Sequence, residues 1–235
     1  MKFIIHQYNE VTSTNDIAIE LAKNGNPEGT VVSAKSQTKG RGRRENKWIS
    51  PDGGLYLSLI LKPKIEIKFI SLFPIFFAGT IIKFIKKNYK LSPKLKWPND
   101  IMLNNKKLGG ILIQSEITQD KIDFLIVGMG INLNTNPIDP SLEKRDVDVL
   151  AFNLGKDINI DTFQKELLDS IKIEYLQFIS FSSDDKIKYI LTVWTQERES
   201  SDKIVLLRDK KETECRIIQL NNDGTLKVEF PNGMV

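Results

Sequence analysis

Hydrophobic and polar positions along this chain alternate in patterns that predict strands and helices in close succession. Leucine occupies every second position from Leu55 to Leu61, as a half-buried strand requires. Residues 12–16 are types that cap helices, and apolar residues then recur at helical spacing as far as Gly25. Further helices are predicted over residues 68–87, 163–178 and 184–194. Strands are predicted over residues 3–5, 30–34, 55–61, 94–103, 108–115, 122–133, 203–207, 215–220 and 226–230, with loops over 37–52 and 135–148.

The most apolar stretch runs from Phe69 to Ile82 and is interrupted by Pro74. At about 14 residues it is shorter than the roughly 20 that a membrane-spanning helix needs. The apolar start of the chain is too short for a signal peptide. We therefore expect a cytoplasmic protein without a membrane partner, in which this stretch is a buried core helix.

The composition excludes several classes of protein. The 235 residues suffice for one large domain, or for one domain with a small appendage. Hydrophobic residues make up 40% and charged residues 27%, which is typical of a globular chain and not of a disordered or fibrous one. Because Cys215 is the single cysteine and His6 the single histidine, a disulfide framework, a CxxC redox pair and a two-histidine zinc site are excluded.

The formal net charge of +4 is unevenly distributed. Residues 1–110 contain 19 Lys and Arg against 8 Asp and Glu, whereas residues 111–235 contain 15 against 22. A basic half suggests an anionic partner such as a nucleotide, a nucleic acid or a membrane surface. The alternative is that these lysines are simply spread over solvated helices.

The predicted loop Gly40-Arg41-Gly42-Arg43-Arg44-Glu45-Asn46-Lys47-Trp48 is rich in glycine and cations. Glycines let backbone N–H groups approach an anion, and arginine can clamp a carboxylate or phosphate with two parallel hydrogen bonds. The flat face of Trp48 could stack on an aromatic base. A basic patch for nucleic acid, or an exposed loop, is the alternative interpretation.

Three further segments carry polar residues or glycines at the ends of predicted elements. Ser13-Thr14-Asn15 opens a helix, where free N–H groups and hydroxyls suit a carboxylate, ureido group or phosphate, although simple capping explains it as well. Lys96-Trp97-Pro98-Asn99-Asp100 breaks a strand, because proline cannot donate to the ladder, and exposes a carboxamide and a carboxylate. In Lys107-Leu108-Gly109-Gly110, paired glycines inside a strand indicate that something approaches the backbone closely.

The segment Gly128-Met129-Gly130-Ile131-Asn132 ends an apolar strand. It lacks the third glycine and the following helix of a dinucleotide-binding fingerprint. The chain also contains no GxxxxGK[ST], GxSxG or HExxH motif, so it is not a P-loop protein and carries neither of the other two catalytic signatures.

Taken together, these segments resemble those of biotin–protein ligases, also called biotin–[acetyl-CoA-carboxylase] ligases, from about residue 3 to about residue 220. The resemblance rests on five motifs in this order: Ser13-Thr14-Asn15, Gln37 with residues 40–44 and Trp48, residues 96–100, residues 107–110, and Gly130-Ile131-Asn132.

The resemblance implies a two-step reaction. The biotin carboxylate attacks the α-phosphate of MgATP, giving biotinyl-5′-AMP and pyrophosphate. A lysine of the biotin carboxyl carrier domain of acetyl-CoA carboxylase then attacks this mixed anhydride. Both steps develop charge around phosphate, so positioning and cationic stabilisation would serve without a nucleophilic side chain.

The resemblance also assigns residues to the site. The catalytic residues would be Lys107, Arg43 and Asp100, with Asp100 also a candidate for the magnesium shell or for orienting the incoming lysine. Biotin would be bound by Ser13, Thr14, Asn15, Gln37, Gly40, Arg41, Gly42, Arg43, Lys107 and Gly110. ATP would be bound by Arg41, Arg43, Arg44, Trp48, Asn99, Lys107 and Asn132.

The implied fold is α+β, a mixed β-sheet backed by helices, with a small SH3-like C-terminal β module. We expect the catalytic domain over residues 1–200 and the module over residues 201–235. The Ser-Thr-Asn motif begins at residue 13 and leaves no room for the helix-turn-helix of the DNA-binding relatives, so we expect no repressor activity and no DNA partner. Relatives usually continue past the position of Val235, so the question whether the C-terminal module is truncated stays open. The question whether the chain forms a homodimer through the central sheet stays open as well.

Two other functions are weighed against this one. A lipoate–protein ligase or octanoyl transferase has a similar catalytic fold, but typically carries a histidine after the paired glycines, and the transferase a catalytic cysteine. Here Ile111 follows Gly110, and Cys215 lies in the tail. A nucleic-acid-binding module would instead show salt-sensitive oligonucleotide binding without dependence on biotin.

Overall fold

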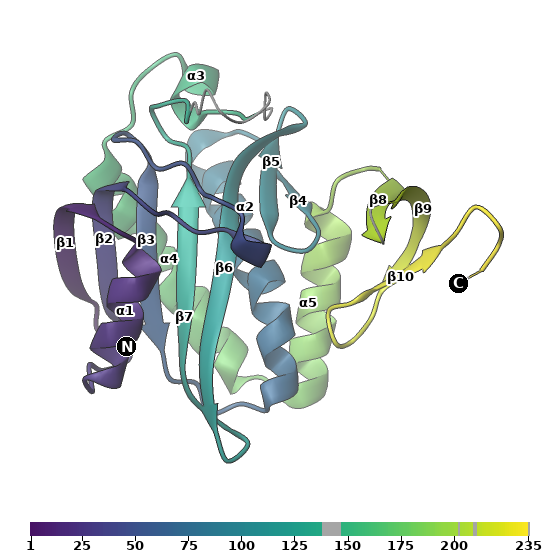
Figure 1. Cartoon of the computed structure of the whole chain (residues 1–235), viewed down its shortest axis with the longest axis horizontal. Coiled ribbons are helices and arrows are strands. Elements are labelled where there is room, and N and C mark those ends of the chain that lie inside the picture. The colour runs from purple at the N-terminus through teal and green to yellow at the C-terminus, as the bar shows by residue number, and fades with distance from the viewer. Residues whose placement is uncertain (138–146, 202, 209–210, 235) are drawn as a thin grey trace.

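The strands of the main body form one mixed sheet in the order β1-β2-β3-β7-β6-β5-β4 (Figure 1). The structure is a computed structural model that describes residues 1–137, 147–201, 203–208 and 211–234. β1 and β2 are parallel, and the other neighbouring pairs are antiparallel, which confirms the expected mixed sheet. The strands are β1 (Ile4–Val11), β2 (Thr30–Gln37), β3 (Leu55–Leu61), β4 (Lys94–Lys96), β5 (Asp100–Leu103), β6 (Lys106–Thr118) and β7 (Lys121–Ile131).

Helices cover the two faces of this sheet unequally. α1 (Thr14–Lys23) packs on one face, against β2, β3 and β7, and α2 (Phe73–Tyr89) packs on the other with α4 (Ile160–Ser180) and α5 (Ser183–Glu197). Successive strand residues point to opposite faces, so Val31 joins the large core around α2 while Val32 joins the small core under α1. The face that carries α1 is therefore only partly covered.

α2 is the buried core helix that the apolar stretch predicts. Together with the 3₁₀ turn η2 (Ile67–Leu72) it is long and apolar enough to cross a membrane, but 67% of that window is buried inside the structure. Phe76 is fully buried, and its ring centroid lies 4.6 Å from that of Phe178 in α4. This stretch packs against the sheet and the neighbouring helices.

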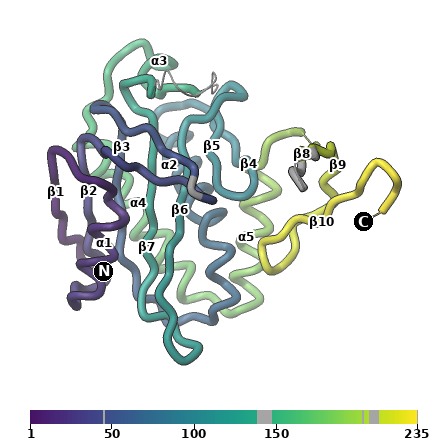
Figure 2. The backbone as a smooth tube through the Cα atoms, viewed as in Figure 1, coloured from purple at the N-terminus to yellow at the C-terminus, as the bar shows by residue number. Residues whose placement is uncertain are grey.

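The C-terminal segment forms a second, antiparallel sheet in the order β10-β9-β8. Its strands are β8 (Lys203–Arg208), β9 (Lys211–Leu220) and β10 (Leu226–Glu229), and Figure 2 shows them beside α5. Leu220 is buried, and Ile217 and Leu226 pack against the main core. A small three-stranded sheet thus lies where the C-terminal β module is expected, while the domain boundary at residue 200 stays a prediction.

Several elements differ from the sequence-based predictions, most clearly in three places. β1 extends through polar residues to Val11, because it is an edge strand with one side open to solvent. The single strand predicted over residues 94–103 is a hairpin of β4 and β5, with Pro98 in its turn. The short helix α3 (Leu150–Leu154) was not predicted, and most of the predicted loop before it, residues 138–146, lies outside the described residues.

Candidate functional site

A cavity of about 580 Å³ opens on the sheet face that carries α1. Its walls come from the start of α1, the loop after β2, the β4–β5 hairpin, the first half of β6 and the C-terminal part of β7. Segments far apart in the sequence therefore meet here. Of the residues that the sequence assigns to the site, the cavity is lined by Ser13, Thr14, Asn15, Gln37, Arg41, Gly42, Arg43, Arg44, Trp48, Asn99, Asp100, Lys107 and Gly110.

The floor of the cavity is a network of buried polar side chains at the start of α1. Ser58 Oγ is hydrogen-bonded to Thr14 Oγ1 at 2.8 Å and to Asn15 Oδ1 at 2.6 Å, and Ser58 is fully buried. The backbone N–H of Thr14 donates to Gln37 Oε1 at 2.8 Å. Ser13 is buried too, and its side chain makes no capping hydrogen bond at α1, so simple capping does not explain this motif.

The same network extends in two directions. Asn15 Nδ2 donates to Gln114 Oε1 at 2.6 Å, which links α1 to β6. Gln37 Nε2 donates to Ser50 Oγ at 2.8 Å, and Ser50 Oγ donates to the carbonyl oxygen of Trp48 at 3.1 Å, which links β2 to the cation-rich loop. Because these side chains fix one another, the floor is pre-organised for a polar ligand.

Sequence reasoning did not identify Ser50, Ser58 or Gln114 as site residues. The alternating leucines predict a half-buried β3 with Ser58 on its solvent side, and this prediction is wrong, because every residue of β3 is buried. A serine in a strand that is covered on both faces needs a polar partner. The serine among the leucines of β3 was therefore the feature of the sequence that could have indicated Ser58.

Glycines on β7 make room for the residues above them. A Cβ at Gly128 would lie 2.3 Å from Asn15 Oδ1, and a Cβ at Gly130 would lie 2.6 Å from Trp48 Cε2. Of the paired glycines of β6, Gly109 shows the predicted close approach, because a Cβ there would lie 2.8 Å from the carbonyl oxygen of Gly130. Gly110 lines the cavity, and a Cβ there would lie at an ordinary contact distance of 3.6 Å from Trp48 Cζ3. The sheet backbone itself is therefore part of the cavity floor.

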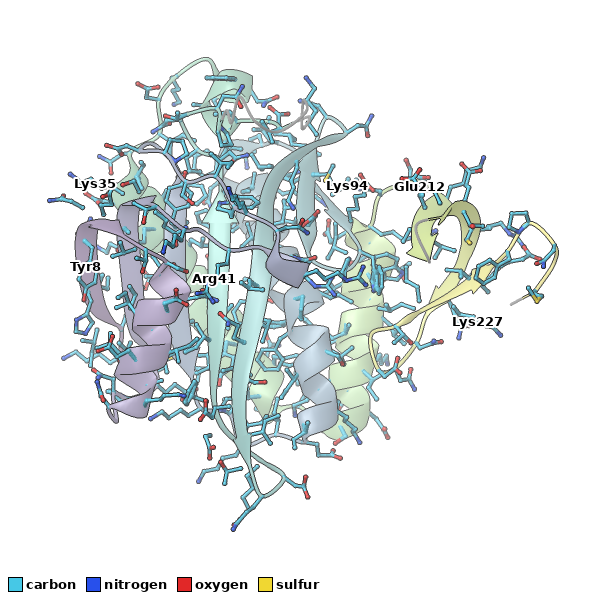
Figure 3. All side chains as sticks on the ribbon, in the orientation of Figure 1. Tyr8, Lys35, Arg41, Lys94, Glu212 and Lys227 are labelled. Carbon is cyan, nitrogen blue, oxygen red and sulfur yellow. The ribbon has the colours of Figure 1, made fainter. Side chains whose placement is uncertain are left out.

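Several cations line the rim of the cavity, and three of them, Lys107, Arg41 and Arg43, each have a polar partner. Lys107 Nζ lies 2.7 Å from Asp100 Oδ1 and 5.3 Å from the centroid of the Trp48 ring. Arg41 Nη2 pairs with Asp16 Oδ2 at 2.9 Å, and Figure 3 shows Arg41 in front of the sheet beside α1. These contacts hold the charges over the floor.

Arg43 links this rim to the β4–β5 hairpin. Its Nη1 donates to Asn99 Oδ1 at 3.3 Å, and Asn99 Nδ2 donates in turn to the carbonyl oxygen of Ile111 at 2.7 Å. Burial and, after it, the neighbouring Arg44 lower the pKa of Arg43, whereas Asp100 acts in the opposite direction. Close packing of like charges favours an anionic ligand that would relieve their repulsion.

Two predicted site residues lie behind the cavity wall. Asn132 is buried, and its Nδ2 donates to the carbonyl oxygens of Lys107 at 3.2 Å and Asp148 at 3.1 Å, so its contacts support a role in holding the Lys107 backbone. A Cβ at Gly40 would lie 2.3 Å from the carbonyl oxygen of Trp48, which makes glycine necessary where the loop closes. Direct ligand contacts by these two residues stay predictions.

The cavity has a rim rich in cations and a floor of polar side chains and glycines. This combination is typical of an α+β domain that binds a small molecule with an anionic group. Residues 8–132, more than half of the chain, match the model of the Biotin/lipoate A/B protein ligase family. The chain belongs to this family.

Individual relatives agree with this assignment. The chain is 39% identical over 142 residues to the bifunctional ligase/repressor BirA of Bacillus subtilis, a match that covers 60% of this chain and 44% of that protein. It is 32% identical over 129 residues to the biotin–[acetyl-CoA-carboxylase] ligase of Paracoccus denitrificans, covering 53% of this chain and 52% of that one. The chain thus spans about half the length of the curated relatives it matches.

Solved structures match over nearly the whole chain. The biotin protein ligase of Aquifex aeolicus in complex with biotin and ATP superposes with a TM-score of 0.78 at 28% identity, covering 97% of this chain and 93% of that one. The Leishmania major ligase in complex with biotin gives a TM-score of 0.67 at 25% identity, covering 98% and 96%. The catalytic fold expected from the sequence is therefore confirmed.

Proposed function

We propose that this protein activates biotin with ATP and transfers the biotinyl group to a lysine of a biotin carboxyl carrier domain. One observation carries the proposal: a floor of mutually bonded polar side chains and a rim of cations face the same cavity. The floor suits the uncharged ureido ring of biotin, and the rim suits its carboxylate and the phosphates of ATP. The Aquifex relative, which was solved with both ligands, supports the same pairing.

In the first step a carboxylate oxygen of biotin attacks the α-phosphorus of ATP. The bond to the β-phosphate oxygen breaks, pyrophosphate leaves, and biotinyl-5′-AMP remains. Negative charge grows on the non-bridging oxygens of the α-phosphate and on the departing pyrophosphate oxygen, where Lys107 and Arg43 would stabilise it. Asp100 would hold the Lys107 ammonium in place through their 2.7 Å ion pair.

In the second step the amine of the carrier lysine attacks the carbonyl carbon of the adenylate. The bond to the phosphate oxygen breaks, AMP leaves, and the nitrogen loses a proton as the amide forms. Asp100 is our candidate to orient that amine, since it lines the cavity. The name of the Paracoccus relative supports acetyl-CoA carboxylase as the source of the carrier domain.

Magnesium would enter with ATP as part of the substrate. Within the described residues no group of three or more His, Cys, Asp or Glu side chains could hold a metal ion. The single carboxylate of Asp100 fits a magnesium ion that keeps most of its ligands from phosphate and water. The remaining chemistry is supplied by cations of the chain.

The proposal is tested by mixing the purified protein with biotin, MgATP and an apo carrier domain. We expect pyrophosphate release that depends on biotin, followed by a mass increase of the carrier that matches one biotinyl group. A folded protein that releases no pyrophosphate and leaves the carrier unmodified would contradict the proposal.

A further inference from the structure

The β4–β5 hairpin is held from outside the cavity as well as from inside. Inside, Asn99 Oδ1 accepts from Arg43, and Asp100 pairs with Lys107. Trp97 itself lines the cavity, and its Nε1 donates to the carbonyl oxygen of Gly224 at 2.9 Å, outside the cavity in the turn between β9 and β10. Trp97 therefore joins the small sheet to the hairpin that holds two cations of the rim.

The turn that accepts this hydrogen bond is itself fixed on the main body. Ser71 Oγ in η2 donates to the carbonyl oxygen of Asp223 at 2.6 Å. Gly224 has a φ of +82°, and a Cβ there would lie 3.0 Å from Leu72 Cδ2 and 3.1 Å from the carbonyl oxygen of Ser71. The glycine thus permits both the left-handed backbone and the close approach. A fixed turn can position the side chain that binds it.

The segment that follows α5 contacts the same hairpin. The backbone N–H of Glu199 donates to the carbonyl oxygen of Leu95 at 3.0 Å, and Leu95 forms an isolated parallel bridge with Arg198. Burial raises the pKa of the Glu199 carboxyl, and Asp100 acts in the same direction while Lys96 opposes it. The C-terminal region therefore meets the hairpin at both Leu95 and Trp97.

We propose that Trp97 is a positioning residue for adenylation. Through its hydrogen bond to Gly224, the small sheet fixes the hairpin, and through Asn99 and Asp100 the hairpin fixes Arg43 and Lys107. Cations stabilise a transition state only when they are held close to the developing charge. A looser hairpin should therefore lower kcat more than it raises KM for biotin. This inference rests on the proposed function.

The test compares Trp97→Phe with Lys203→Ala in the full chain. Trp97→Phe keeps an aromatic ring and removes the indole donor. Lys203→Ala is the matched control, because it removes a hydrogen bond within the small sheet, from Lys203 Nζ to Glu214 Oε1, that involves neither the turn at Gly224 nor the hairpin. Three quantities are measured: kcat and KM for biotin in pyrophosphate release, and the rate of amide hydrogen exchange over residues 97–100 without substrates.

We expect Trp97→Phe to lower kcat about tenfold, to leave KM for biotin within about twofold, and to speed exchange over residues 97–100. Lys203→Ala should leave all three quantities within about twofold of the wild type. The inference is overturned if Trp97→Phe changes neither kcat nor exchange, if only one of them changes, or if Lys203→Ala produces the same loss. A wild-type chain that releases no pyrophosphate refutes the proposed function instead, and the exchange data then decide by themselves whether Trp97 holds the hairpin.

Discussion

The two faces of the seven-stranded sheet are built for different purposes. On the face of α2, α4 and α5, the rings of Phe73, Phe76, Phe77, Phe178 and Tyr189 pack against one another. On the face of α1, polar side chains bond to one another around an open cavity. The comparison shows that one face of the sheet carries the packing that stabilises the fold, and the other carries the side chains of the candidate site. We call the face of α2, α4 and α5 the helical face and the face of α1 the cavity face. Substitutions on the helical face should unfold the protein. Substitutions on the cavity face should leave the protein folded but inactive.

The largest effect is expected from Lys107→Ala. It removes the cation nearest to Asp100 at the rim, so we expect kcat for biotin-dependent pyrophosphate release to fall by about 10²- to 10³-fold with the melting temperature unchanged within about 2 °C. Lys106→Ala, its exposed neighbour, is the control and should retain activity. Near-normal release by Lys107→Ala would remove this residue from its proposed role.

The opposite behaviour is expected from Phe76→Ala on the helical face. This ring is fully buried and contacts Phe77 and Phe178, so its loss should lower the free energy of unfolding by about 3–5 kcal/mol in urea denaturation. Phe152→Ala, at a side chain that is 66% exposed, should cost less than about 0.5 kcal/mol. Equal destabilisation by the two variants would contradict the assignment of the core to this face.

A smaller and more selective effect is expected from Ser58→Ala. The substitution leaves Thr14 Oγ1 and Asn15 Oδ1 without their shared partner, so KM for biotin should rise about tenfold while kcat stays within about twofold. Ser115→Ala, at an exposed position of β6, is the matched control. A fall in kcat without a change in KM would show that the floor acts on the chemistry and not on binding.

The smallest effect concerns alkaline pH. Tyr175 donates its hydroxyl to Glu28 Oε1 at 2.6 Å, and burial, followed by this hydrogen bond and the charge of Glu28, raises the pKa of the phenol. The unfolded chain then loses its proton at lower pH than the folded one, so stability falls as pH rises above the ordinary value of about 10. Tyr175→Phe should make this fall shallower, by at most about 1.4 kcal/mol per pH unit in denaturation at pH 9–11. An unchanged slope would contradict the raised pKa.

The sequence predicts the helical face well because its signals are local. The period of α4 and the alternation of β3 are readable within one element, and the apolar stretch of α2 identifies the core helix. On the cavity face, the motifs predict which residues gather there through their resemblance to a family. Ser58 and Gln114 were missed because their partners lie 43 and 99 positions away in the chain, and local patterns do not encode such contacts. The same holds for the hydrogen bond of Trp97 across 127 positions.

The proposed function is tested most directly by detecting the adenylate that the protein forms. The purified protein is incubated with MgATP labelled in the α-phosphate and with biotin, lipoate or octanoate in separate reactions, and the products are resolved by mass and label. We expect labelled biotinyl-5′-AMP in the reaction with biotin and no labelled adenylate in the reactions with lipoate or octanoate. The biotinyl-5′-AMP should stay bound to the protein at about one equivalent per site. No adenylate with biotin, or an adenylate formed from lipoate or octanoate in its place, would contradict the account.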